Sequence, residues 1–168
     1  MAHIFIGVGS SINRRENIRL GIQALQQAFG ELRLSNVYES EAVGFDGSHF
    51  YNLVVELSSD LSIEELITQL KAIEIQLGRP LKALKYAPRT LDLDLLLYDD
   101  VIDNSRDLPR AEITLNAFVL KPLAELAPTL LHPVLKLSYH TLWSQYPANK
   151  QKLWKVDSPV ITEPLSPQ

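Results

Sequence analysis

The chain has 168 residues, of which 46% are hydrophobic, so it is long enough for one domain with a sizeable core. Its formal net charge of −4 provides no overall positive field for nucleic acid, and no run of about 18 apolar residues could form a membrane span. It contains no cysteine, which excludes disulfides, thiolate metal sites and a cysteine nucleophile.

The first half of the chain alternates strand and helix patterns. The opening residues lack the basic region and long apolar run of a signal peptide, so we expect a cytoplasmic protein. The first predicted strand covers residues 3–8. Asn13 is a plausible N-cap for a helix that Gly30 ends, because apolar residues recur between them at helical spacing. Two segments rich in β-branched and aromatic residues, 32–40 and 49–59, predict strands.

The second half opens with a capping box, because Glu65 follows three residues after Ser62. The helix that begins there is expected to end at Gly78. After a basic loop, the sequence predicts a strand over 91–98, a tight turn at 99–100 and a short strand at 101–103. A helical segment over 114–127, interrupted at Pro122, and a short helix over 138–146 follow, and the prolines beyond Val156 predict a loosely ordered tail.

This order of elements predicts an α+β fold, the ferredoxin-like β-α-β-β-α-β arrangement with an added hairpin and C-terminal helices. The sequence shows neither internal repeats nor an internal linker, so we expect one domain. Many unrelated proteins share this arrangement, and the function must therefore come from particular residues.

The segment PRTLDLDLLLYDD, residues 88–100, carries the most informative pattern. Leucines occupy every second position of the strand and predict one buried face: Leu91, Leu93, Leu95 and Leu97. Asp92 and Asp94 fall on the other face, with Cα atoms roughly 6.5–7 Å apart. Two such carboxylates repel each other unless water screens them or a cation binds between them, and ligands that offer only oxygen suit Mg²⁺. A solvated face is the alternative.

Basic residues lie close to these acids in the sequence, at Arg79, Lys82, Lys85 and Arg89. Phosphate binding requires both a metal and nearby cations, whereas a plain solvated face requires neither. The segment therefore favours a metal that is bound together with a nucleotide.

The segment KYAPRTLDLDLL, residues 85–96, resembles the signature of the 6-hydroxymethyl-7,8-dihydropterin pyrophosphokinases (HPPK) of folate biosynthesis. The resemblance extends to GVGSS, YES, VGF, FYNLVVEL, IEIQLGR and FVLKPLAELAPTLLHP, and so covers most of residues 3–133. It implies transfer of a diphosphate from ATP to the pterin's hydroxymethyl group, with release of AMP and with two Mg²⁺ ions on the triphosphate. We therefore expect a monomer with one pyrophosphokinase-like domain over 1–155 and a tail over 156–168. We expect the protein to bind neither nucleic acid nor a membrane.

The resemblance also implies a role for individual residues. The metal ligands would be Asp92 and Asp94, and the residues that act on the phosphates would be these two acids with Arg79, Lys82 and Arg89. The nucleotide would contact Glu74, Arg79, Arg89, Leu95, Arg106 and Arg110. The pterin would contact Ser40, Val43, Phe50, Asn52, Tyr86 and Phe118, with the two phenylalanines on either side of its ring and Asn52 at its polar edge.

Several of these residues have a purely structural alternative. Arg79 would also suit the C-terminal end of a helix, where a cation is favourable, and Glu74 could be a solvated helix residue. Leu95 and either phenylalanine could simply pack in a core. Asn52 is harder to explain in this way, because it interrupts an apolar strand and a buried amide needs hydrogen-bond partners.

Three positions depart from the family pattern. Arg110 stands where the family usually has a histidine and should take over its phosphate contact, while Asn116 and Leu81 stand where arginines are usual. One hypothesis is the pyrophosphokinase itself, and another is a duplicated relative that binds a pterin or nucleotide with weak or altered catalysis. A third, a ferredoxin-like module that binds nucleic acid, is disfavoured by the negative charge and by the lack of a Gly-Phe-type stacking motif.

Overall fold

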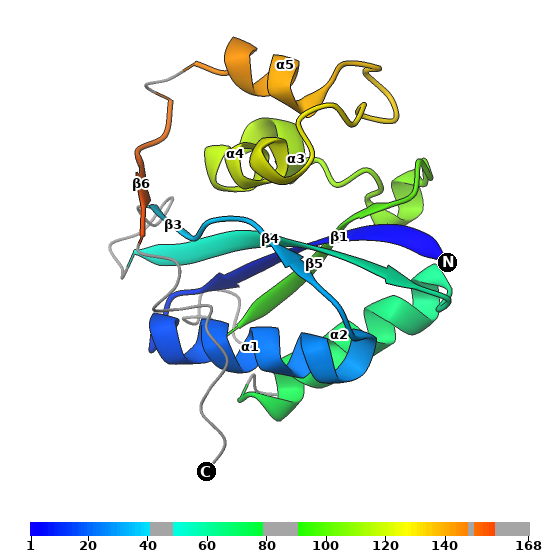
Figure 1. Ribbon diagram of the computed structural model, residues 1–168, viewed down its shortest axis with the longest axis vertical. Coiled ribbons are helices and arrows are strands. Elements are labelled where there is room, and N and C mark those ends of the chain that lie inside the picture. The colour runs from blue at the N-terminus through cyan, green and yellow to red at the C-terminus, as the bar shows by residue number, and fades with distance from the viewer. Residues whose placement is uncertain (41–48, 79–90, 148–149, 157–168) are drawn as a thin grey trace.

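The computed structural model describes residues 1–40, 49–78, 91–147 and 150–156. The strands are β1 (Ala2–Ser10), β2 (Arg33–Leu34), β3 (Tyr38–Ser40), β4 (Phe50–Ser59), β5 (Asp92–Tyr98) and β6 (Leu153–Lys155). The helices are α1 (Arg14–Phe29), α2 (Ile63–Gln76), α3 (Glu112–Leu115), α4 (Ala117–Leu126) and α5 (Tyr139–Gln145), with a 3₁₀ turn η1 (Asn104–Arg106). Together they form a mixed α/β structure around one sheet (Figure 1).

The sheet lies between two layers of helices (Figure 1). Its strands follow the order β5-β1-β4-β3-β6, β2 pairs with β4, and the pairings are antiparallel. Helices α1 and α2 cover one face, and α3, α4 and α5 lie over the other. None of the helices in the described ranges is long and apolar enough to cross a bilayer.

Local sequence signals account for the helix ends. Helix α1 begins after Asn13, as predicted, but Asn13 has a φ of 41° and its side chain makes no capping hydrogen bond within the described residues. The helix is followed by Gly30, whose φ of 83° suits a residue without a Cβ. Helix α2 has the predicted capping box, because the Ser62 hydroxyl accepts from the Glu65 N–H and the Glu65 carboxylate accepts from the Ser62 N–H. Ser138 caps α5 in the same way, through the N–H of Thr141.

Each face of the sheet packs in its own apolar core. Between the sheet and the α1/α2 layer lie alternate residues of β1 and β4, among them Ile4, Ile6, Val8, Leu53, Val55 and Leu57. The second core, between the sheet and the α3–α5 layer, contains Phe5, Val54, Ile113, Leu120, Leu123 and Tyr139. Both faces of the central strands are therefore buried, as in a three-layer structure.

A β-bulge in β5 changes the side on which its residues lie. Ile6 pairs with Leu95 and Phe5 pairs with Leu97, so Leu96 is an extra residue in β5. As a result Leu95 packs in the α1/α2 core, whereas Leu96 and Leu97 both pack in the other core. The predicted alternation of leucines is therefore correct as far as Leu95 and wrong at Leu97.

Other predicted elements differ in their limits. The strand expected over 32–40 is divided into β2 and β3, because the Ser35 hydroxyl accepts a hydrogen bond from the Val54 N–H in place of a backbone carbonyl. The helix expected over 114–127 starts earlier, at Glu112, and is broken at Asn116, whose ψ of 124° is extended. Pro122 lies inside α4 instead of interrupting it.

The added hairpin that the sequence predicted is not formed. Residues 101–103 make a single bridge, between Asp103 and Leu108, around the η1 turn. The Asp103 carboxylate accepts hydrogen bonds from both the N–H and the hydroxyl of Ser105, and these local bonds stabilise the turn instead of a strand. Strand β6 was not predicted. Of the tail expected over 156–168, Val156 is described and its N–H donates to the Val37 carbonyl at 2.9 Å, whereas residues 157–168 lie outside the described ranges.

Candidate functional site

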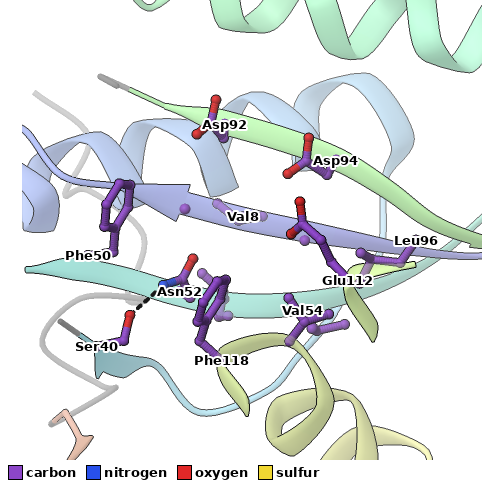
Figure 2. Close-up of a pocket in the computed structure, with 14 residues that line it drawn as sticks. Val8, Ser40, Phe50, Asn52, Val54, Asp92, Asp94, Leu96, Glu112 and Phe118 are labelled. Carbon is purple, nitrogen blue, oxygen red and sulfur yellow. Dashed lines mark hydrogen bonds between the residues drawn. The ribbon is translucent and has the colours of Figure 1, made fainter. Parts of the chain in front are cut away.

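A cavity of about 240 Å³ opens on the side of the sheet that faces α3 and α4 (Figure 2). Strands β1, β3, β4 and β5 form its floor and walls, and α3 and α4 each contribute side chains. Residues at even positions of β4 and β5 face it, because neighbouring residues of a strand point to opposite sides of the sheet. The cavity therefore collects residues that are far apart in the sequence.

One end of the cavity is aromatic and contains an amide. It brings together four of the residues that the sequence assigned to the pterin: Ser40, Phe50, Asn52 and Phe118. The Asn52 amide nitrogen donates to the Ser40 hydroxyl at 3.4 Å, which orients the side chain within the cavity (Figure 2). Two aromatic rings beside a polar amide are suited to a flat heterocycle with hydrogen-bonding groups along its edge.

Two glycines of β1 form part of the cavity floor. Gly9 pairs with Asn52 across the β1–β4 ladder, and a Cβ at Gly9 would lie 2.7 Å from the Asn52 amide oxygen. A Cβ at Gly7 would meet Leu96 at 3.4 Å, close to an ordinary contact. The missing side chain at position 9 therefore leaves the space that the Asn52 amide occupies.

The other end of the cavity is acidic. Asp92 and Asp94 leave β5 on the same face, as the sequence predicted, and both line the cavity (Figure 2). Among the described residues no group of three or more histidine and acidic side chains could hold a metal. The pair fits a hard cation such as Mg²⁺, which takes one or two carboxylates and completes its shell with water and substrate phosphates.

Arg110 lies beside this acid pair. Its Nη2 atom is 3.5 Å from Oδ1 of Asp94 and 3.3 Å from Oε1 of Glu112, and its Nη1 atom is 3.9 Å from Oδ2 of Asp107. Partial burial by itself would lower the pKa of Arg110, but the three carboxylates raise it above its ordinary value. The guanidinium is therefore a permanent positive charge among the acids at the edge of the cavity.

Glu74 occupies a buried position behind the acid pair. The residue is 6% exposed, and Oε2 accepts a hydrogen bond from the backbone N–H of Leu93 at 2.9 Å. The alternative that Glu74 is a solvated helix residue is therefore wrong. Leu93 lies between the two aspartates in the sequence, so Glu74 links α2 to the backbone that carries them.

Two residues that the sequence assigned to the nucleotide lie away from the cavity. Leu95 is 7% exposed and packs in the α1/α2 core, as its structural alternative predicted. Arg106 donates to Asp103 at 2.7 Å and also pairs with Glu64 at the start of α2. Within the described ranges, Leu95 therefore packs in a core and Arg106 forms ion pairs, and their nucleotide roles stay predictions.

The remaining assigned residues fall outside the described ranges: Val43, Arg79, Lys82, Tyr86 and Arg89. Their predicted roles stay predictions. Conversely, the cavity contains residues that the sequence did not single out, notably Glu112, Gly7 and Gly9. The glycine pair in GVGS, at alternate positions of the first strand, was a usable signal, whereas nothing in the local pattern marks Glu112.

Comparisons with known proteins agree on one family. The model of the family described as "7,8-dihydro-6-hydroxymethylpterin-pyrophosphokinase (HPPK)" matches residues 5–128. A protein of Aquifex aeolicus named "2-amino-4-hydroxy-6-hydroxymethyldihydropteridine pyrophosphokinase" is 32% identical over 140 residues, which are 81% of this chain and 87% of that protein. A Pseudomonas aeruginosa protein of the same name is 37% identical over 140 residues, covering 77% of this chain and 83% of its own length.

A solved structure has a similar fold. It is that of Plasmodium falciparum HPPK-DHPS A437G with STZ-DHP, which superposes with a TM-score of 0.68 over 86% of this chain. The sequence identity is 13%, so this likeness concerns the fold alone. The chain spans 45% of the Plasmodium protein, less than half of its length.

Proposed function

Because the chain belongs to the 7,8-dihydro-6-hydroxymethylpterin-pyrophosphokinase family, we propose that it transfers a diphosphate from ATP to 6-hydroxymethyl-7,8-dihydropterin in folate biosynthesis. One observation carries the proposal: a single cavity has an aromatic, amide-containing end and an acidic end. The first end suits a pterin, and the second suits the metal-bound phosphates of a nucleotide. The two substrates would therefore meet in the middle of the cavity.

The pterin would bind at the aromatic end. Its ring would lie between Phe50 and Phe118, while Asn52 would hydrogen-bond to the polar edge of the ring, in an orientation that Ser40 supports. Gly9 helps this arrangement, because it leaves room for the Asn52 amide. Sequence positions Val43 and Tyr86 would complete the pterin contacts.

The triphosphate of ATP would bind at the acidic end. Asp92 and Asp94 would hold Mg²⁺, which when bound neutralises charge on the phosphate oxygens. Arg79, Lys82 and Arg89 would contribute the cations that contact the phosphates. Of the other residues that the resemblance assigned to the nucleotide, Glu74 would act from behind the acid pair, through its hydrogen bond to the Leu93 backbone. Leu95 and Arg106 would reach the nucleotide only if their side chains left the positions described above. Arg110 would supply a further phosphate contact, in place of the histidine that the family usually has.

The proposed reaction is a displacement at phosphorus. The hydroxymethyl oxygen of the pterin attacks the β-phosphorus of ATP, and the bond from this phosphorus to the oxygen that bridges the α- and β-phosphates breaks. AMP leaves with that oxygen, the hydroxyl proton passes to solvent, and the pterin carries the diphosphate. The chain's own contribution is to align the two substrates and to place cations around the phosphates.

The same proposal extends to the organisation of the protein. The antiparallel strand order and the two helices that connect the core strands support a ferredoxin-like topology, here elaborated by α3, α4, α5 and β6. We expect one pyrophosphokinase-like domain over residues 1–155, followed by a tail, and a monomer in the cytoplasm.

The direct test is a coupled product assay. Protein is incubated with ATP, Mg²⁺ and 6-hydroxymethyl-7,8-dihydropterin, and AMP and diphosphorylated pterin are measured by mass spectrometry. Equal amounts of the two products are expected, and none when either Mg²⁺ or the pterin is left out. Formation of ADP, or AMP release that does not depend on the pterin, would contradict a diphosphate transfer.

A second candidate is a family relative that binds both substrates but turns over slowly. Two observations favour it. Arg110 is paired with Asp94, a proposed metal ligand, and Asn116 uses its side-chain oxygen to accept a hydrogen bond from Gln151 at 3.1 Å. Binding of a pterin and of an ATP analogue, measured by calorimetry, together with a negligible yield in the product assay would support this candidate over the enzyme.

A further inference from the structure

One guanidinium lies between two carboxylates at the acidic end of the cavity. The Nη2 atom of Arg110 is 3.5 Å from Asp94 and 3.3 Å from Glu112, so the same nitrogen is within reach of both. The Arg110 side chain is 25% exposed, and the side chains of Asp94 and Glu112 are each 38% exposed. Figure 2 shows the Glu112 carboxylate directed toward Asp94 from the opposite wall of the cavity.

The backbone keeps these three residues together. The Arg110 N–H donates to the Leu96 carbonyl at 3.0 Å, which joins the arginine to β5, the strand that carries Asp94. The Arg110 carbonyl in turn accepts from the Ile113 N–H at 3.1 Å, at the start of α3, the helix that carries Glu112. Nη2 therefore lies between the two carboxylates and can lose one of them while it keeps the other.

The position of Arg110 has a consequence for any cation that binds Asp94. A divalent ion and a guanidinium that share one carboxylate repel each other, and at these distances the repulsion is considerable even in a partly solvated site. The ion therefore competes with Arg110 for Asp94. Glu112 provides a nearby carboxylate to which the displaced guanidinium can remain paired.

We propose that Arg110 is an internal counter-ion that occupies Asp94 in the metal-free protein, and that Glu112 retains the guanidinium when a divalent metal takes Asp94. The inference rests on the proposed function, which supplies the metal. Glu112 is then a positioning residue that acts through Arg110: Nη2 stays paired with Glu112, and its N–H that faced Asp94 becomes available to a phosphate. Arg110 should weaken metal binding, and Glu112 should strengthen it only while Arg110 is present.

Binding of Mn²⁺ to the nucleotide-free protein tests this proposal without any measurement of turnover. Free Mn²⁺ is measured by electron paramagnetic resonance during a titration. Since partly exposed ion pairs are individually weak, Arg110→Gln should tighten Mn²⁺ binding by roughly three- to tenfold, and Glu112→Gln should weaken it by roughly twofold or more. Unchanged or weaker binding by Arg110→Gln would overturn the proposal.

A double variant separates the action of Glu112 through Arg110 from a direct effect on the metal. If Glu112 acts through Arg110, Glu112→Gln should weaken Mn²⁺ binding clearly in the native background and much less in the Arg110→Gln background. An equal loss in both backgrounds would mean that Glu112 attracts or binds the metal itself, and would overturn the positioning role.

Two further variants serve as a charge control and as a substitute for Arg110→Gln. Arg33→Gln removes a cation that is paired with Glu56 on the far part of β4, so it should leave Mn²⁺ affinity close to native and report the effect of net charge alone. Arg110→Lys keeps the charge but lacks the planar fork that contacts several carboxylates, and it is the substitute if Arg110→Gln does not fold. It should also bind Mn²⁺ more tightly than the native protein, and unchanged binding would count against the proposal.

Asp94→Asn distinguishes failure of the inference from failure of the proposed function. It should abolish tight Mn²⁺ binding. If it does so while Arg110→Gln leaves the affinity unchanged, the metal site stands and the counter-ion role falls. If native protein yields no diphosphorylated pterin in the product assay, the proposed function fails, whatever the effect of Arg110 on Mn²⁺.

Discussion

The carboxylate of Glu74 accepts a hydrogen bond from the backbone N–H of Leu93, with a nitrogen–oxygen distance of 2.9 Å. β5 is an edge strand of the described sheet, so N–H groups on its outer side need an acceptor other than a neighbouring strand. Glu74 provides one from α2, at the residue between Asp92 and Asp94. The acid pair is thus carried by backbone that is tied to a helix on the other face of the sheet.

We predict that Glu74→Ala lowers the free energy of unfolding by roughly 1–3 kcal/mol, because it leaves a buried N–H without an acceptor. Glu74→Gln retains a side-chain oxygen and should lose less. Urea denaturation measures both variants. Lys71→Ala, an exposed position on the same helix, is the control and should stay close to the native value. Equal stability of Glu74→Ala and Lys71→Ala would rule out the structural role.

We predict that Asp92→Asn and Asp94→Asn each reduce turnover by more than roughly a hundredfold, since a metal ligand at the phosphates is worth several kcal/mol in the transition state. Stability should change by less than about 1 kcal/mol, because the two carboxylates repel each other and the ion pair between Asp94 and Arg110 is partly exposed. Steady-state kinetics and thermal unfolding measure the two effects. Asp100→Asn, in the exposed turn after β5, should keep native activity. Near-native turnover of either acid variant would show that the metal lies elsewhere.

Gly9→Ala should weaken pterin binding by about tenfold, because its Cβ would lie 2.7 Å from the Asn52 amide oxygen and would move a group expected to hydrogen-bond to the pterin. Gly7→Ala lies on the same floor but would meet Leu96 at 3.4 Å, so it should cost less. Calorimetric titration with 6-hydroxymethylpterin compares the two. If Gly7→Ala binds more weakly than Gly9→Ala, the importance of the Gly9–Asn52 pair is disproved.

His132 should make stability depend on pH. Its Nδ1 atom accepts hydrogen bonds from the N–H groups of Val134, at 3.2 Å, and Leu135, at 3.1 Å, and burial lowers the pKa of His132 below its ordinary value. The unfolded chain therefore takes up a proton near pH 6.5 that the folded chain resists. The stability that the neutral His132 side chain contributes is therefore complete above this pH and is lost as the pH falls below it.

Urea denaturation at pH 7.5 and 5.5 tests the role of His132. The native protein should lose more stability over this interval than His132→Asn, whose amide oxygen accepts hydrogen bonds but does not titrate. His140→Asn, at an exposed position, should follow the native protein. If native protein and His132→Asn lose the same amount, the pH dependence comes from other groups.

Tyr139→Phe should raise the free energy of unfolding by up to about 2 kcal/mol, because an unpaired buried hydroxyl carries a desolvation penalty. Tyr139 is 0% exposed, its hydroxyl has no hydrogen-bond partner among the described residues, and burial raises the pKa of Tyr139. Tyr38→Phe is the contrasting variant, since the Tyr38 hydroxyl donates to Glu125 at 2.5 Å and its loss should destabilise. A destabilised Tyr139→Phe would show that this hydroxyl has a partner after all.

The elements around the α1/α2 core could be predicted because their signals are local. The capping box at Ser62 and the apolar periodicity of α1 and α2 depend on residues a few positions apart. Strand β6 could not be predicted in this way, since its three residues are ordered by pairing with β3, more than a hundred positions earlier. The break at Asn116 is another case, because its side chain is held by Gln151.

The candidate site was predictable to the extent that it follows strand alternation or a family signature. Asn52 was marked by its place in an apolar strand, and the two aspartates by their spacing. No sequence pattern marked Glu112, because it comes close to the acid pair only through the packing of α3 against the sheet. The partners of Arg110 were equally hidden, since a sequence shows that a cation is present but not which of several acids it will contact.

The bulge at Leu96 makes the length of β5 as important as its composition. Before it, an even position faces the cavity and an odd position faces α1 and α2; after it, the rule is reversed, so Leu97 shares a side with the aspartates. A deletion or insertion of one residue between Asp94 and the turn at Asp99 would leave the rest of the sequence unchanged and still exchange the two faces of the sheet along part of the strand. The placement of the acid pair relative to the rest of β5 thus depends on the number of residues in the strand, which a substitution does not change.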